Sequence, residues 1–108
     1  MELPEAREIY DAIAKSKLSA LRRQFLEAAV RYAEKRTAWA LASPDERRTL
    51  GAARSAAHDA FIDACNILSR NMAEGGEDNS WRRRIGTDRK EIGDFACFLH
   101  CLLGLTAR

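Results

Sequence analysis

Five polar side chains along one stretch of the chain are of types that can carry acid–base or metal chemistry. They are His58, Asp59, Asp63, Asn66 and Arg70. From Asp59 onward the spacing is three or four residues, so in a helix these side chains share one side. Carboxylates and an imidazole placed in this way can bind a metal ion or act as a general acid and base, as in a small metal-dependent hydrolase. The alternative, which we favour, is a solvated or interhelical polar face on which Arg70 pairs with an acid such as Asp94, and we predict no catalytic residue.

An aromatic residue followed by basic residues forms the second candidate site. Trp81 directly precedes Arg82, Arg83 and Arg84, and Arg89 and Lys90 follow closely. Arginines beside a stacking aromatic suit RNA or single-stranded DNA, and the same residue types anchor protein interfaces. A third alternative is that the indole covers the end of the folded helices while the arginines pair with nearby acids. We take Trp81 and the three arginines as candidate partner-binding residues.

Three cysteines and one neighbouring histidine raise the question of a metal site. Cys97 and Cys101 are one helical turn apart with His100 beside them, and Cys65 is on a different predicted helix. Structural zinc sites commonly use paired Cys-x-x-Cys motifs, and this chain has none. Free cysteine is often a small buried side chain. We therefore predict reduced cysteines, no metal and no cofactor.

Composition limits the classes of function that are open. The 108 residues include 18 Lys and Arg against 16 Asp and Glu, a net charge of +2. This balance argues against binding nucleic acid by bulk charge, although a local basic patch remains compatible with it. No apolar run approaches the roughly 20 residues that span a bilayer, and residues 1–5 lack the pattern of a signal peptide. We expect a cytoplasmic protein that does not bind membranes.

The elements that would position these residues are long helices. Residues 4–42 contain no internal Gly or Pro, and Leu18, Phe25, Tyr32 and Trp39 recur every seven residues. Ser43, Pro44 and Glu46 together predict the capped start of a second helix over residues 44–74. Gly75 and Gly76 predict its end. Residues 76–86 are expected to form a loop, and Asp88 begins a third helix that ends near Gly104.

The residues from His58 to Asp63, together with those from Asp88 to Ala96, carry a resemblance. These segments resemble small bacterial helical proteins to which no activity is attached. The resemblance covers the C-terminal half of the chain. It implies that Asp63, Asn66, Arg89 and Asp94 belong to a network joining the second helix to the start of the third.

The sequence therefore predicts an all-α protein with one domain spanning residues 1–108. The expected architecture is an antiparallel bundle of three long helices, or four if the first breaks near Ser16. Because the third helix is short, part of the apolar seam that contains Phe25 and Trp39 should remain uncovered and bind a second copy or another protein. We expect a non-enzymatic interaction or regulatory module that self-associates. The alternatives are nucleic-acid binding through Trp81 and a hydrolase built on His58, Asp59 and Asp63.

Overall fold

The fold is entirely helical over the part of the chain that the structure describes. The computed structural model describes the backbone of residues 1–106 and the side chains of residues 1–104. The helices are α1 (Leu3–Ala14), α2 (Ser19–Leu41), α3 (Pro44–Glu74), α4 (Trp81–Ile85) and α5 (Arg89–Thr106). The predicted all-α class is confirmed, and the first predicted helix is divided near Ser16.

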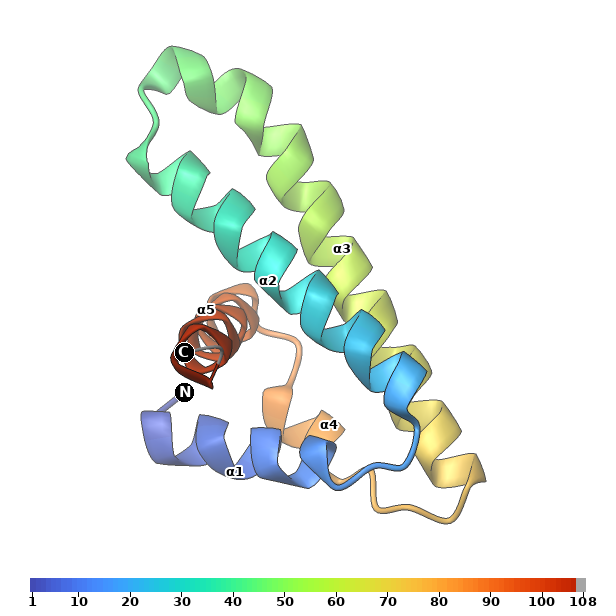
Figure 1. The fold of residues 1–108 in the computed structure, drawn as a ribbon. Coiled ribbons are helices and arrows are strands. Elements are labelled where there is room, and N and C mark those ends of the chain that lie inside the picture. Colours follow the sequence, from blue (N-terminus) through green and yellow to red (C-terminus); the bar gives the residue numbers. More distant parts are fainter. Residues whose placement is uncertain (107–108) are drawn as a thin grey trace.

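Helices α2 and α3 form a long antiparallel hairpin, which dominates the shape of the molecule (Figure 1). The turn between them is fixed by the predicted capping box. The Ser43 hydroxyl accepts a hydrogen bond from the Glu46 backbone N–H at 3.3 Å, and the Glu46 carboxylate accepts one from the Ser43 N–H at 3.2 Å. Two N–H groups that the first turn of α3 leaves unpaired are thus satisfied locally, which is why α3 begins here.

The break between α1 and α2 is held by a residue far away in the sequence. Ser16 is buried, and its hydroxyl donates to the Glu77 carboxylate at 2.9 Å. The Lys17 backbone N–H donates to the other oxygen of Glu77, also at 2.9 Å. Arg22 reaches back to the carbonyl oxygens of Ala14 and Ser16. The chain can leave the helix here because its free backbone groups find these partners.

The end of α3 is as the sequence predicts, but the segment after it is not wholly a loop. Gly76 adopts a φ of 78°, and the Glu77 N–H donates to the Met72 carbonyl at 2.8 Å, which closes α3 with a left-handed cap. The Asn79 side chain then donates to the carbonyl and hydroxyl oxygens of Ser69. This anchor directs the chain into the short helix α4, so the prediction of a loop over residues 76–86 was wrong at its second half.

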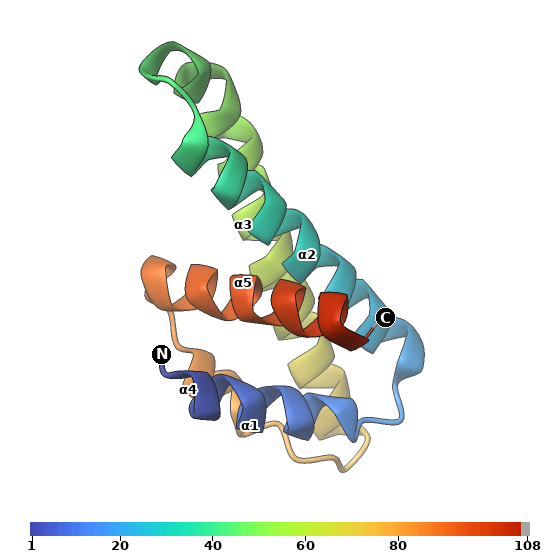
Figure 2. The same ribbon diagram turned by 60° about the vertical axis from the view of Figure 1, so that its left-hand side comes forward.

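Helix α5 begins at the predicted N-cap, where the Asp88 carboxylate accepts a hydrogen bond from the Glu91 N–H at 3.0 Å. It crosses the hairpin steeply instead of running along it, and α1 lies below it in Figure 2. Phe25 of α2, Phe61 of α3 and Phe95 of α5 meet at this crossing, with ring centroids 5.4–6.5 Å apart. Helix α5, which corresponds to the third helix predicted from the sequence, thus covers the middle of the hairpin. The end of the hairpin at the turn between α2 and α3, called its far end below, is left uncovered.

Candidate interaction surfaces

The candidate surface around Trp81 does not form, because Trp81 belongs to the core. Its side chain is 1% exposed, and its ring lies edge-on to Phe25 with the centroids 6.0 Å apart. Helix α4 turns the indole inward, and the ring nitrogen has no hydrogen-bond partner among the described residues. Phe25 is likewise fully buried. The expectation that these two side chains bind a partner is therefore corrected: both are used to close the fold.

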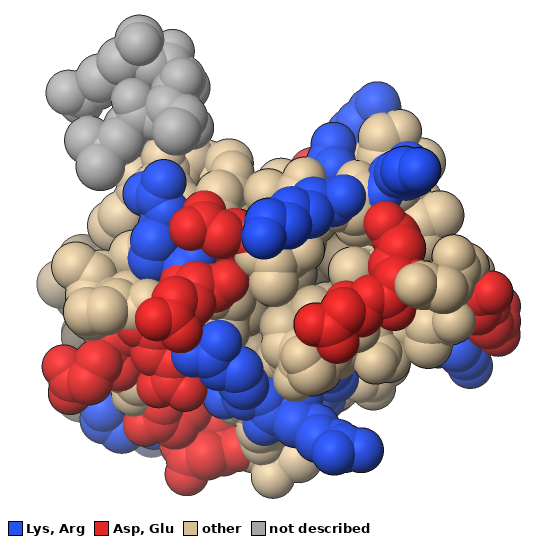
Figure 3. Space-filling model, turned by 90° about the horizontal axis from the view of Figure 1, so that it is seen from below, with Lys and Arg blue, Asp and Glu red and all other residues tan. Residues whose placement is uncertain are grey.

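Two of the three arginines after Trp81 bind other residues of the same chain. Arg82 donates to the Asn66 side chain at 2.8 Å and to the Gly86 carbonyl at 3.0 Å. Arg84 pairs with Glu8 of α1 at 2.8 Å. Arg83 is exposed and has no ion pair within the described part of the chain. Acidic and basic side chains alternate on the face of the molecule seen in Figure 3, without a continuous basic patch.

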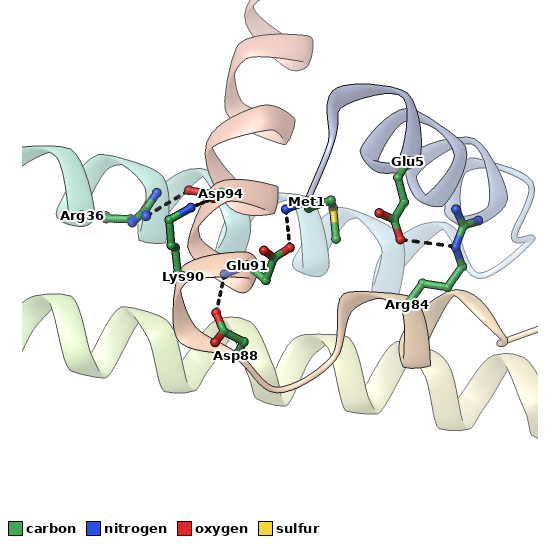
Figure 4. Close-up of polar contacts among 8 residues, drawn as sticks. All are labelled: Met1, Glu5, Arg36, Arg84, Asp88, Lys90, Glu91 and Asp94. Carbon is green, nitrogen blue, oxygen red and sulfur yellow. Dashed lines mark hydrogen bonds and ion pairs between the residues drawn. The ribbon is translucent and has the colours of Figure 1, made fainter.

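The polar network exists at Asp94, but its partners differ from those predicted. Asp94 accepts from Arg36 of α2 at 3.1 Å and from Lys90 at 3.0 Å, as Figure 4 shows. Burial alone would raise the pKa of Asp94, but the hydrogen bonds from Lys90 and Arg36 outweigh it and lower that pKa. Arg70 was expected to pair with Asp94, and it is instead exposed on α3.

Arg36 is the residue that the sequence interpretation missed. Its guanidinium lies directly over Gly93 of α5, where an added Cβ would come within 2.6 Å of Nε. It also donates to the Cys97 sulfur at 3.5 Å. The small residues at positions 93 and 97 therefore make room for Arg36 of α2. Gly93 was the feature of the sequence that could have indicated this contact, because a glycine inside a helix often marks a place where another group approaches the backbone closely.

Three of the remaining polar candidates, Asp63, Asn66 and Arg70, line one open pocket on α3, and His58 and Asp59 lie outside its lining. His58 contacts the Asp59 carboxylate at 3.1 Å and packs edge-on against Tyr32. Asp63 and Arg89 are exposed, and neither has an ion pair within residues 1–104. Among the side chains that the structure describes, no three His, Cys, Asp or Glu residues are grouped as metal ligands.

The three cysteines differ in environment. Cys65 is fully enclosed in the core, and burial raises the pKa of its thiol to about 12. At neutral pH it is therefore protonated and unreactive. Cys97 is half-buried beside Arg36, and Cys101 is exposed. This arrangement assigns Cys65 to packing and leaves Cys101 as the accessible thiol.

The far end of the hairpin carries Trp39, the third aromatic residue predicted to bind a partner, after Trp81 and Phe25. Its half-buried ring lies between the guanidinium groups of Arg47 and Arg54, whose carbons are 4.3 and 4.2 Å from the ring centroid. Arg47 also donates to the carbonyl oxygens of Trp39 and Ala40 at 3.1 Å, which satisfies the last turn of α2. Leu41 follows with 83% of its side chain exposed.

A groove of about 350 Å³ runs along the outer side of α2. Leu26 and Val30 of α2 and Leu103 of α5 form its apolar lining, and charged residues of α2 surround it. Leu26 and Val30 are partly buried, whereas Arg23, Glu27, Arg31 and Glu34 of the same helix are exposed. This part of α2 is the second candidate interaction surface.

Comparison with protein-family models, curated proteins and solved structures finds no match to the chain. Within residues 1–106, none of the helices is both long enough and apolar enough to cross a membrane. Two surfaces stand out from their own chemistry: the end of the hairpin around Trp39 and Leu41, and the groove on the outer side of α2.

Proposed function

We propose that the chain is a small non-enzymatic protein-interaction module whose docking element is the far end of the α2–α3 hairpin. One observation carries this proposal: residues 37–56 include no buried side chain. The hairpin continues well past α5, as Figure 1 shows, and within residues 1–104 its end adds no residue to the hydrophobic core. This helical arm, residues 37–56, contributes little to the core, so its surface is available for another use.

The arm is reinforced locally, which suits a docking element. Most helix stability in proteins comes from tertiary packing, and here that packing is thin. The Ser43–Glu46 capping box, the Arg47 hydrogen bonds and the stacked Trp39 take its place. A surface that is already ordered loses less conformational entropy when it binds, so contacts at its end translate more fully into affinity.

The residue types at this end are those that protein interfaces favour. Leu41 projects into solvent next to Trp39, and Arg47 and Arg54 flank the indole. Tryptophan and arginine are enriched among the residues that dominate binding energy. The nucleic-acid alternative loses its stacking group because Trp81 is buried, and for the hydrolase alternative the described side chains include no group of three His, Cys, Asp or Glu residues that could hold a metal ion. Neither is favoured by an observation of its own.

The proposal is tested by photo-crosslinking from the end of the arm. A benzophenone amino acid replaces Leu41, and a control chain carries it at Arg70, which is exposed on the other half of α3. Illumination in extract of the source cells should give a discrete adduct from position 41 and none from position 70. The protein in the adduct is then purified and titrated with wild-type chain, with Leu41→Asp and with Arg70→Glu.

The expected result is a loss of affinity of about tenfold or more for Leu41→Asp, with Arg70→Glu near wild type. Because Leu41 is 83% exposed, its substitution should leave the helix content and the midpoint of thermal unfolding almost unchanged. Equal crosslinking from both positions, or equal affinities for the two variants, would overturn the assignment of the arm as the docking element.

A further inference from the structure

The outer side of α2 presents a ridge of residues with coiled-coil spacing. Arg23, Glu27, Val30 and Glu34 follow one another at intervals of four, three and four residues, so they form one line along the helix. Leu26 and Arg31 flank this line, and the groove of about 350 Å³ lies along it. The line and its two flanking residues form one continuous helix face, which we call the ridge. Helices in coiled coils pair through faces with this spacing.

The charged side chains on this ridge are unused by the fold. Arg23, Glu27, Arg31 and Glu34 are exposed, and none of them has an ion pair with another residue in positions 1–104. This holds even for Glu27 and Arg31, which stand in the favourable order one turn apart. By contrast, Arg7–Asp11 and Lys90–Asp94 do form such pairs on other helices. The ridge charges are thus free to pair with another molecule.

The order of the charges matches the ridge to itself. Along α2 the signs alternate from Arg23 to Glu27 to Arg31 to Glu34. When a second α2 lies antiparallel on the first, Arg23 faces Glu34 of the second copy, and Glu27 faces Arg31 of the second copy. Both pairs are centred at the level of residues 28 and 29 along α2, so a single two-fold axis that crosses the ridge at this level relates both pairs at once.

We propose that this face is the interface of a homodimer in which two α2 helices pack antiparallel across a two-fold axis that crosses the ridge at the level of residues 28 and 29. The half-buried apolar residues Leu26 and Val30 lie between the charged pairs and are covered by the same contact. The two positive and two negative charges of the ridge sum to zero. A strongly acidic or basic partner would therefore meet repulsion at half of these four positions, whereas a second copy places an opposite charge at each of the four.

This dimer face is separate from the arm proposed above as the docking element. The ridge ends at Glu34, and Leu41 lies two turns further along α2. The two surfaces can therefore be tested independently with variants of the same chain.

The experiment is sedimentation equilibrium on the full chain, because it measures the dimer dissociation constant directly. The variants are Glu27→Arg, Arg31→Glu and the double variant that exchanges the two charges. Arg70→Glu is the matched control, since it reverses an exposed charge on α3 away from the ridge. Leu41→Asp is measured as well, and circular dichroism establishes that every variant keeps its helix content.

The wild-type chain should be a dimer. Each single reversal should weaken it by about tenfold or more, because like charges then face each other twice in the symmetric contact. The double variant restores the opposite-charge pairs and should return the dissociation constant to within about threefold of wild type. Arg70→Glu and Leu41→Asp should have no effect.

Three results would each overturn the proposal. One is a wild-type chain that remains monomeric up to about 200 µM, which corresponds to too weak an association for a functional dimer. Another is a dimer that both single reversals leave intact or that the double exchange does not restore. The third is a dimer lost on Leu41→Asp, since this would place the contact on the arm.

Discussion

Replacing Trp81 with alanine tests whether the indole belongs to the core or to a binding surface. The side chain is 1% exposed and lies edge-on to Phe25, 6.0 Å between centroids. Truncating a fully buried Trp typically costs about 3–5 kcal/mol, through lost transfer free energy and the cavity left behind. Here the indole N–H already lacks an acceptor, a burden of about 1–3 kcal/mol that the alanine removes. We therefore expect a loss near the lower end, about 3 kcal/mol.

The assay is urea unfolding followed by far-ultraviolet circular dichroism, with two companion variants. Trp81→Phe keeps an aromatic ring and removes the unpaired N–H, so its cost should be about 1 kcal/mol. Arg83→Ala changes an exposed side chain two residues further along α4 and should stay within about 0.5 kcal/mol of wild type. If the unfolding free energy of Trp81→Ala also stays within about 1 kcal/mol of wild type, the assignment of Trp81 to the core is wrong and Trp81 is again a candidate binding residue.

Two further predictions concern the contact between α2 and α5. Gly93→Ala gains about 1 kcal/mol of helix propensity. The added Cβ would lie 2.6 Å from Nε of Arg36, so the guanidinium must move. The movement breaks the part-exposed ion pair between Arg36 and Asp94, which is worth up to about 1 kcal/mol. In urea unfolding Gly93→Ala should be near neutral in the wild-type chain and stabilising by about 1 kcal/mol when Arg36 is alanine, and an equal effect in both backgrounds would contradict this. Asp94 has a lowered folded pKa, so its contribution is complete above the unfolded value of about 3.9 and is lost as the pH falls through the folded pKa. Asp94→Asn should therefore flatten the acid side of a plot of unfolding free energy against pH, whereas a curve parallel to that of wild type would show that Asp94 is not the group responsible.

The parts of the fold that the sequence predicts are those fixed by neighbouring residues. The Ser43 capping box, the left-handed Gly76 and the Asp88 cap all form as expected, because each depends on side-chain and backbone groups within five residues. The break at Ser16 was foreseen as an alternative from its local composition. Its partner Glu77 was not, since the two residues are 61 positions apart and no local pattern connects them.

The parts that could not be predicted depend on contacts between distant segments. A Trp followed by three arginines is typical of a binding surface, and only the anchoring of Asn79 on Ser69 shows why α4 turns Trp81 inward. The pairing of Asp94 with Arg36 depends in the same way on where α5 crosses α2. Charge and aromatic content indicated candidate residues, but contacts between segments far apart in the sequence decided which of them are exposed.

The crossing of α5 also changes where self-association must occur. The sequence argument for a dimer was that a short third helix leaves the seam containing Phe25 uncovered. In the structure, α5 lies across that seam and Phe25 is fully buried, so the argument no longer applies to that face. The same crossing leaves two other regions of α2 open: the outer ridge around Val30 and the end beyond Arg36. The proposed dimer would use the charged side of α2. The far end of the α2–α3 hairpin would remain available for a different protein.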